Sequence, residues 1–198
     1  MKPLILRSLT IAAMAVISMT ATSCTMLQEI GALRQVNFDF DRVSQTRLAG
    51  VNVDNVRSYE NLGPIDAGRI ATAVASQRMP LSFQLHLSAQ NPSQNSRARL
   101  VRMDWTLFLA GTETVSGIFD SPRVIEPGQT ADIPIGIELD LMRFFGNNVR
   151  DLVDLALAVS GQPGHQTEVT LRFQPTIETS LGPMRYPTPI TVTRRIGG

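Results

Sequence analysis

The chain has 198 residues, about the length of one domain with extra segments. With 43% hydrophobic and 18% charged residues it can build a core, which excludes a chain that is disordered throughout. The formal net charge of +1 is too small for a typical nucleic-acid-binding protein. One cysteine excludes an internal disulfide, and two histidines leave little material for a zinc site or a Cys–His nucleophile. We therefore expect no metal, no cofactor and no nucleic acid.

The first 23 residues have the pattern of an export signal. Two cations, Lys2 and Arg7, precede the apolar run Leu9–Met19. That run is shorter than the ~20 apolar residues that a membrane-spanning helix needs. The pattern therefore predicts a signal peptide that directs the chain out of the cytoplasm.

The small residues after this run lead to Cys24, the chain's only cysteine. They resemble a bacterial lipobox, in which the signal is removed before a cysteine that becomes lipidated, although Ala21 stands where a lipobox usually has leucine. Acyl chains on Cys24 would anchor the protein to a membrane. Thr25, in place of an aspartate that retains lipoproteins in the inner membrane, favours the outer membrane. The alternative is an ordinary secretory signal that leaves a free thiol.

These features predict a membrane-anchored protein that faces the periplasm. The chain then has three parts: a lipoprotein signal peptide over residues 1–23, a tether over 24–34 and one folded domain over 35–198.

Apolar and polar residues alternate along seven segments of the predicted domain. This period of two is typical of strands with one buried face. The segments are Val36–Phe40, Leu48–Val56, Phe83–Ala89, Val101–Leu109, Ile133–Leu139, Val169–Phe173 and Ile190–Val192. One apolar and one polar face suit antiparallel sheets with one side in water. The sequence therefore predicts a mainly β protein folded as an antiparallel β-sandwich.

Two helical patterns interrupt the predicted strands. One covers Asp66–Gln77, with Asp66 as its N-cap, and the other covers Asp140–Val159, with a break at Gly146-Asn147-Asn148. We expect the second helix to close one end of the sandwich. Strand ends and turns are indicated at Asn91-Pro92, Ala110-Gly111 and Pro127-Gly128.

The order of these features resembles the late-embryogenesis-abundant (LEA) type 2 family, also called the WHy domain. The resemblance runs from about Val51 to Val192. It is carried by a strand that ends in Asn91-Pro92, a long strand that closes on Ala110-Gly111, Gly117 after the next strand, and the Pro127-Gly128 turn before Ile133-Pro-Ile. The family usually has Asn-Gly or Asp-Gly where this chain has Ala110-Gly111.

The resemblance implies a single immunoglobulin- or fibronectin III-like sandwich with one or two short helices. The family is associated with desiccation and stress tolerance in plants, and in bacteria its members are often lipoproteins. It has no established catalytic residues, so the resemblance implies no active site.

Few polar side chains are candidates for chemistry. We expect His86 and His165 to be solvated, and we expect Trp105 to pack between the sheets rather than to stack on a ligand. Asp39 and Asp41, two residues apart on one strand, could hold a cation, but a solvated acidic edge is the simpler interpretation.

Two surface groups are candidates for binding. Leu141, Phe144 and Phe145 could line a cavity for an acyl chain or another apolar ligand if they do not simply belong to the core. Arg97, Arg99 and Arg102 could meet anionic head groups or the acidic residues of a partner, or form a solvated loop.

The sequence thus predicts a non-enzymatic envelope lipoprotein with a structural or protective role and a possible envelope protein or lipid partner. The alternative is binding of a lipid or other apolar ligand in transport across the envelope, which a cavity under residues 141–157 would favour. A hydrolase would need a nucleophile and a base that the sequence does not reveal.

Overall fold

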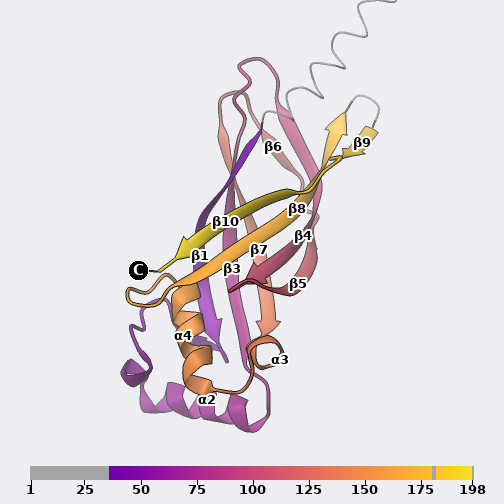
Figure 1. Ribbon diagram of the computed structural model, residues 1–198. Coiled ribbons are helices and arrows are strands. Elements are labelled where there is room, and N and C mark those ends of the chain that lie inside the picture. Colours follow the sequence, from indigo (N-terminus) through magenta and orange to yellow (C-terminus); the bar gives the residue numbers. More distant parts are fainter. Residues whose placement is uncertain (1–35, 180–181, 198) are drawn as a thin grey trace, which may run out of the picture.

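In the computed structural model, which describes residues 36–179 and 182–197, the chain folds into two facing antiparallel sheets with helices at one end (Figure 1). The first half contains β1 (Asn37–Leu48), β2 (Val51–Asn52), the 3-10 helix η1 (Tyr59–Asn61), α2 (Pro64–Ala75), β3 (Pro80–Gln90), β4 (Ala98–Leu109) and β5 (Thr112–Phe119). The second half contains β6 (Arg123–Ile125), β7 (Thr130–Asp140), α3 (Leu141–Phe145), α4 (Val149–Val159), β8 (Thr167–Thr179), β9 (Gly182–Arg185) and β10 (Ile190–Ile196).

Over the described ranges the strands form two sheets of different size. The smaller sheet has the order β2-β1-β3-β7. The larger sheet has the order β10-β8-β4-β5, with β6 also paired to β4 and β9 to β8. All these pairs are antiparallel. The prediction of a mainly β antiparallel sandwich is therefore confirmed.

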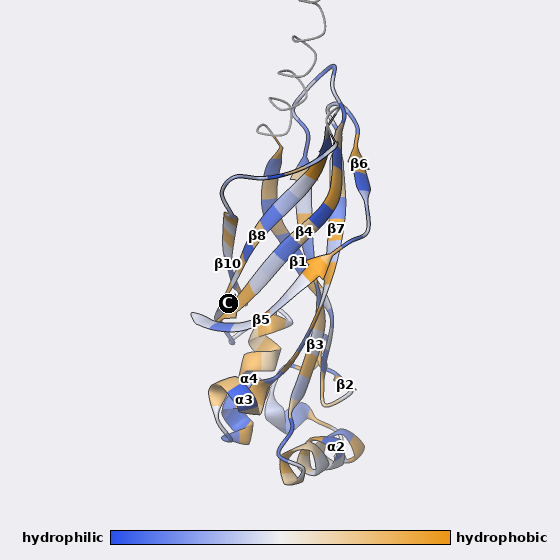
Figure 2. Ribbon diagram, turned by 90° about the vertical axis from the view of Figure 1, so that its right-hand side faces the viewer, coloured by the Kyte–Doolittle hydropathy of each residue, from blue (hydrophilic) through white to orange (hydrophobic). Residues whose placement is uncertain are grey.

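The core lies between the sheets and is built from alternate residues of the strands, as the hydropathy colours along them show (Figure 2). The inward residues of the four main strands are Leu81, Phe83, Leu85 and Leu87; Met103, Trp105, Leu107 and Leu109; Ile133, Ile135, Ile137 and Leu139; and Val169, Leu171 and Phe173. Helix α4 closes the end of this core with Leu152, Val153, Ala156, Leu157 and Val159, which are all buried. Burial of these apolar side chains is the main force that holds the two layers together.

The predicted strand over Leu48–Val56 is wrong in extent. β1 continues to Leu48, the chain reverses at Ala49 and Gly50, which both have positive φ, and β2 has only two residues. The chain then bends because the backbone N–H of Thr46 donates to the Asp54 carboxylate at 2.9 Å. This side-chain acceptor replaces the backbone partner that a longer β2 would have supplied.

The inward face of β4 also differs from the predicted one at its beginning. A register shift between Leu100 and Arg102 leaves Val101 half-buried and puts Leu100 into the core. A bulge of this kind inserts one residue and moves the side chains before it to the other face.

The helices follow the predicted pattern with one correction. The N-cap of α2 is Gly63 rather than Asp66, because Pro64 occupies the first helical position, where its missing N–H costs nothing. The predicted break separates α3 from α4. Asp140 caps α3 by accepting from the N–H of Met142, and Asn148 caps α4 in the same way.

Candidate functional site

The predicted lipidation site, Cys24, lies outside the described residues, so its lipidation stays a prediction. Of the three predicted apolar contacts, Leu141 is fully buried, whereas Phe144 and Phe145 are half-buried against the core. The rings of the two phenylalanines lie 6.4 Å apart, and the Arg143 guanidinium lies 5.5 Å from the centre of the Phe144 ring. Whether these three residues contact a ligand also stays a prediction.

Two hollows of the described surface are lined by other residues. One, of about 440 Å³, lies on the outer face of the larger sheet between Asp104 and Arg172. The other is a groove of about 760 Å³ between α2 and the nearby strand ends. Its walls are formed by Ala49, Ile65, Gly68, Arg69, Thr72, Ala73, Ser76, Arg78, Pro80 and Glu138.

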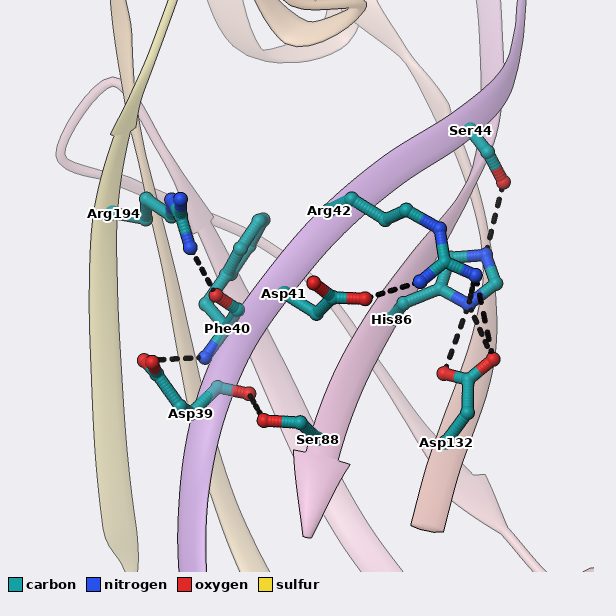
Figure 3. Close-up of polar contacts among 9 residues, drawn as sticks. All are labelled: Asp39, Phe40, Asp41, Arg42, Ser44, His86, Ser88, Asp132 and Arg194. Atoms are coloured by element: carbon teal, nitrogen blue, oxygen red, sulfur yellow. Dashed lines mark hydrogen bonds and ion pairs between the residues drawn. The ribbon is translucent and has the colours of Figure 1, made fainter. Parts of the chain in front are cut away.

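The structure brings together a polar cluster that the sequence did not reveal. We expected His86 to be solvated, and this was wrong, because the residue is only 7% exposed. Its Nε2 lies 2.9 Å from Ser44 Oγ, and its Nδ1 lies 2.9 and 3.0 Å from the two carboxylate oxygens of Asp132 (Figure 3). These three residues and Arg42, named here the His86 cluster, come from β1, β3 and β7 and lie on the outer face of the smaller sheet.

The contacts of His86 determine which ring nitrogen carries the proton of the neutral imidazole. Asp132 only accepts, and its oxygens lie nearer to Nδ1 than the donor Arg42 Nη2 does, so we assign the ring proton to Nδ1. Nε2 then carries the lone pair, and the hydroxyl of Ser44 donates to it. Arg42 Nη2 lies 3.2 Å from Nδ1 and 3.5 Å from Asp132 Oδ2, which places its positive charge beside the carboxylate.

An irregularity in β1 creates this arrangement. Phe40 pairs with Leu87, but the next paired residue is Arg42, opposite His86, so Asp41 is an extra residue. A regular register would set Asp41 opposite His86 and turn Arg42 toward the core. The inserted residue instead puts Arg42 and Ser44 on the outer face with His86. A second irregularity follows Ser44, where Gln45 has a φ of +56°.

Asp39 and Asp41, for which a solvated acidic edge was expected and a cation site was the alternative, are separated by the same irregularity. Asp41 forms an ion pair with Arg42, whereas Asp39 accepts from the backbone N–H of Phe40 at 2.8 Å. Their carboxylates thus have different partners (Figure 3). In the part of the chain that the structure describes, no three His, Cys, Asp or Glu side chains come together as a metal site would require.

His165 is partly buried, so the expectation that it is solvated was wrong as well. It fixes the segment before α2 to the segment after α4, since Nε2 lies 3.2 Å from the carbonyl oxygen of Arg57. Glu60 and Arg150 form an ion pair in the same region. A hydrogen bond from its own backbone amide, followed by one from Ser58 and the charge of Arg150, lowers the pKa of the Glu60 carboxyl. These contacts join the segment before α2 to α4 and the segment after it, and none of them involves a member of the His86 cluster.

The remaining candidates have simple environments. Trp105 is 8% exposed and belongs to the core, as predicted. Arg97, Arg99 and Arg102 are exposed, and Arg102 is 3.2 Å from Asp104, which also pairs with Arg185 at 2.8 Å. Binding of head groups or a partner by the three arginines stays a prediction. No helix within the described residues is long and apolar enough to cross a membrane.

The chain matches no family model and no curated protein sequence. Its fold is similar to those of solved structures at low identity. A candidate LEA protein is 11% identical with a TM-score of 0.42, and the match covers 96% of this chain and 87% of that one. An Arabidopsis thaliana protein is 19% identical with a TM-score of 0.42 over 60% of this chain and 70% of that one. An Archaeoglobus fulgidus protein is 13% identical with a TM-score of 0.37 over 60% and 86%.

Proposed function

We propose that the chain is a cell-envelope lipoprotein with a LEA type 2-like domain that acts without catalysis, through contact with envelope proteins or surfaces. Its role is structural or protective, as in tolerance of desiccation or another stress. The protein faces the periplasm, and Cys24 anchors it to a membrane, for which the outer membrane is the favoured one. The observation that carries this proposal is that three residues behind the family resemblance, Asn91, Gly117 and Gly128, each support the fold.

Asn91, the first of these residues, is fully buried and joins three segments. Its Nδ2 donates to the carbonyl oxygens of Ser96 at 2.8 Å and Ile125 at 3.0 Å, and its Oδ1 accepts from the N–H of Ser93 at 3.1 Å. The amide therefore satisfies two carbonyl groups that would be costly to bury unpaired.

The glycines of the resemblance also have structural roles. A Cβ at Gly117 would lie 2.4 Å from the ring of Trp105, so only glycine leaves room for the ring in this position against β5. Gly128 has a φ of +69°, and the N–H of Gln129 donates to the carbonyl oxygen of Glu126, as in a type II turn. These residues therefore specify the sandwich fold, and any binding function must come from side chains on its surface.

The anchor would hold the domain by the end where β1 begins. Asn37 pairs with Gln90, the last residue of β3, whereas α2 ends shortly before Pro80, the first residue of β3, so α2 lies at the opposite end (Figure 1). Residues 25–36 between Cys24 and β1 span at most about 40 Å when extended. The α2 groove, where Ile65 is 76% exposed, would then point away from the membrane and meet envelope partners.

The alternative function is binding of an apolar ligand. Packing under residues 141–157 counts against a cavity there, because Leu152, Val153 and Ala156 of α4 are buried in the core. The α2 groove, however, has a volume typical of small-molecule sites, which range over roughly 300–1,000 Å³. A lipid that co-purifies with the protein and is lost with Ile65→Asp would support this alternative.

Membrane fractionation tests the anchor. We expect Cys24→Ala to move the protein from the membrane fraction to the periplasmic fraction, because acyl chains could no longer be attached. Ser23→Ala is the matched control and should leave the protein in the membrane. Equal membrane retention of Cys24→Ala would overturn the lipoprotein proposal.

Complementation tests the non-catalytic role. In a deletion strain with a measurable envelope-stress defect, we expect full restoration of growth by His86→Ala, by His165→Ala and by the double change Asp39→Ala, Asp41→Ala. A group that transfers a proton in catalysis typically contributes 10²–10⁴-fold and could not be removed without effect. Failure of any one of the three, with the protein folded and at normal abundance, would show that its residues do chemistry.

A further inference from the structure

We propose that Ser44 is a nucleophile toward activated acyl esters, with His86 as its general base and Asp132 as the residue that positions the base. This inference goes beyond the proposed function and does not depend on it. It assigns a reactive site to the outer face of the smaller sheet.

The contacts have the order that an activated serine requires. Ser44 Oγ donates to His86 Nε2 at 2.9 Å, and His86 Nδ1 donates to Asp132 Oδ2 at 2.9 Å. A hydroxyl becomes nucleophilic when a neighbouring base can accept its proton and a third group holds that base in the correct tautomer. Both conditions are met by side chains from three strands of one sheet.

The environment of His86 strengthens these contacts. The imidazole is nearly buried, and hydrogen bonds shielded from water are electrostatically stronger than exposed ones. Arg42 lies 3.5 Å from Asp132 and pairs with Asp41, so an ion-pair network fixes the carboxylate that orients the ring. The imidazolium formed after proton transfer would face the negative charge of Asp132.

The backbone of β1 provides a second, independent observation. The extra residue Asp41 brings Arg42 and Ser44 to the face of His86, and Gln45 directly after Ser44 is in the left-handed region at φ +56°. Bulges re-aim side chains, and strained non-glycine residues cluster at functional sites. Ser88, on the same face, has no histidine partner and contacts only the carbonyl oxygen of Asp39 at 3.5 Å.

The proposed step conserves atoms and charge. Ser44 Oγ attacks the carbonyl carbon of the ester while its proton passes to His86 Nε2. The bond from that carbon to the alcohol oxygen then breaks, and the alcohol leaves with the proton from His86. The product is an acyl ester of Ser44, and the proposal covers its stoichiometric formation.

The composition of the chain makes the test clean. Lys2 is the only lysine and Cys24 the only cysteine. The chain with Cys24→Ala therefore has no thiol, and its α-amine and Lys2 are its only reactive amines. We would treat it with p-nitrophenyl acetate, and separately with a fluorophosphonate, and locate the added mass by peptide mapping.

We expect one acetyl group, on Ser44, formed at least 100-fold faster than on any other hydroxyl. Ser44→Ala should abolish this label, and Ser88→Ala, the matched control, should leave it unchanged. His86→Gln, which keeps a polar side chain but removes the base, should lower the labelling rate of Ser44 at least 10-fold. Asp132→Asn should lower the rate at least 10-fold, and Asp132→Glu should restore part of it.

Labelling that is spread over several serines, or that survives Ser44→Ala, would overturn the proposal. Should a variant at His86 or Asp132 fail to fold, the unaltered chain and Ser88→Ala still decide, because a label that is not concentrated on Ser44 excludes an activated serine there. The anchor experiment with Cys24→Ala is read by membrane fractionation, so failure of one proposal leaves the other standing.

Discussion

The outer faces of both sheets carry polar residues, but the contacts that these residues form differ between the two sheets. On the larger sheet, β4 and β8 pair without a break from Arg102 to Leu109. Its outward side chains form exposed cross-strand contacts, such as Thr106–Ser116 at 3.0 Å, Thr170–Thr193 at 2.8 Å and the Arg172 guanidinium over the Phe108 ring at 5.1 Å. Such pairs stabilise a sheet by a few tenths of a kcal/mol to ~1 kcal/mol each.

The smaller sheet has a different outer face because β1 is irregular on both sides of Arg42 and Ser44. There the polar side chains converge on one histidine and bury it. The comparison teaches that the two closely spaced irregularities of β1 gather polar side chains around one histidine, whereas the uninterrupted β4–β8 register from Arg102 to Leu109 keeps them in separate cross-strand pairs. Substitutions in the core of the larger sheet, in the His86 cluster and in the turn between β4 and β5 test this comparison.

The largest effect is expected inside the larger sheet. Trp105→Ala should lower the free energy of unfolding by about 3–5 kcal/mol, the usual range for a buried large aromatic. The value should lie toward 3, because the indole N–H finds no acceptor among the described residues and its removal relieves an unpaired donor. A denaturant titration measures the loss.

Ile118→Ala is the control for this substitution, since Ile118 is exposed on the outer face of the same sheet. It should change the free energy of unfolding by no more than about 0.5 kcal/mol. A loss below ~1 kcal/mol for Trp105→Ala would show that the inner face of the larger sheet is not the core.

A smaller loss of stability is expected at the His86 cluster. His86→Ala should cost about 1–2 kcal/mol, because Ser44 and Asp132 lose their partner, although Asp132 can still reach water. Thr106→Ala removes a polar contact of the regular sheet and should cost less than about 0.5 kcal/mol. If both substitutions lowered the free energy of unfolding equally in the same titration, the His86 cluster would add no more stability than an ordinary cross-strand pair. The two outer faces would then not differ in this respect.

Much of the sandwich could be predicted from the sequence because most strands are regular. The alternation over Phe83–Ala89 and Ile133–Leu139 places the buried residues correctly, and Trp105 is in the core as expected. The break between α3 and α4 follows from Asn148, a residue that caps helices well.

The His86 cluster could not be predicted for two reasons. Its members are distant in the chain, since Ser44 and Asp132 lie 42 and 46 residues from His86. The extra residue, Asp41, also leaves no mark in the sequence, because no glycine or proline indicates it, and Gln45 has positive φ without being glycine. The polar face of His86 was thus predictable, whereas its burial depends on the register of a neighbouring strand.

The smallest effect concerns the turn between β4 and β5. Ala110 and Gly111 have φ values of +50° and +76°, the geometry of a type I′ turn that asparagine and glycine favour. Ala110 is exposed, so Ala110→Asn removes backbone strain without a change in packing and should stabilise the protein by about 1 kcal/mol. For a chain of this size that gain corresponds to a melting temperature about 2–4 °C higher by calorimetry. Gly111→Ala, which introduces the same strain one residue later, should lower the melting temperature by a similar amount. If both substitutions shifted it in the same direction, the turn would not be of type I′, and the pairing of Leu109 with Thr112 that flanks it would have to be revised.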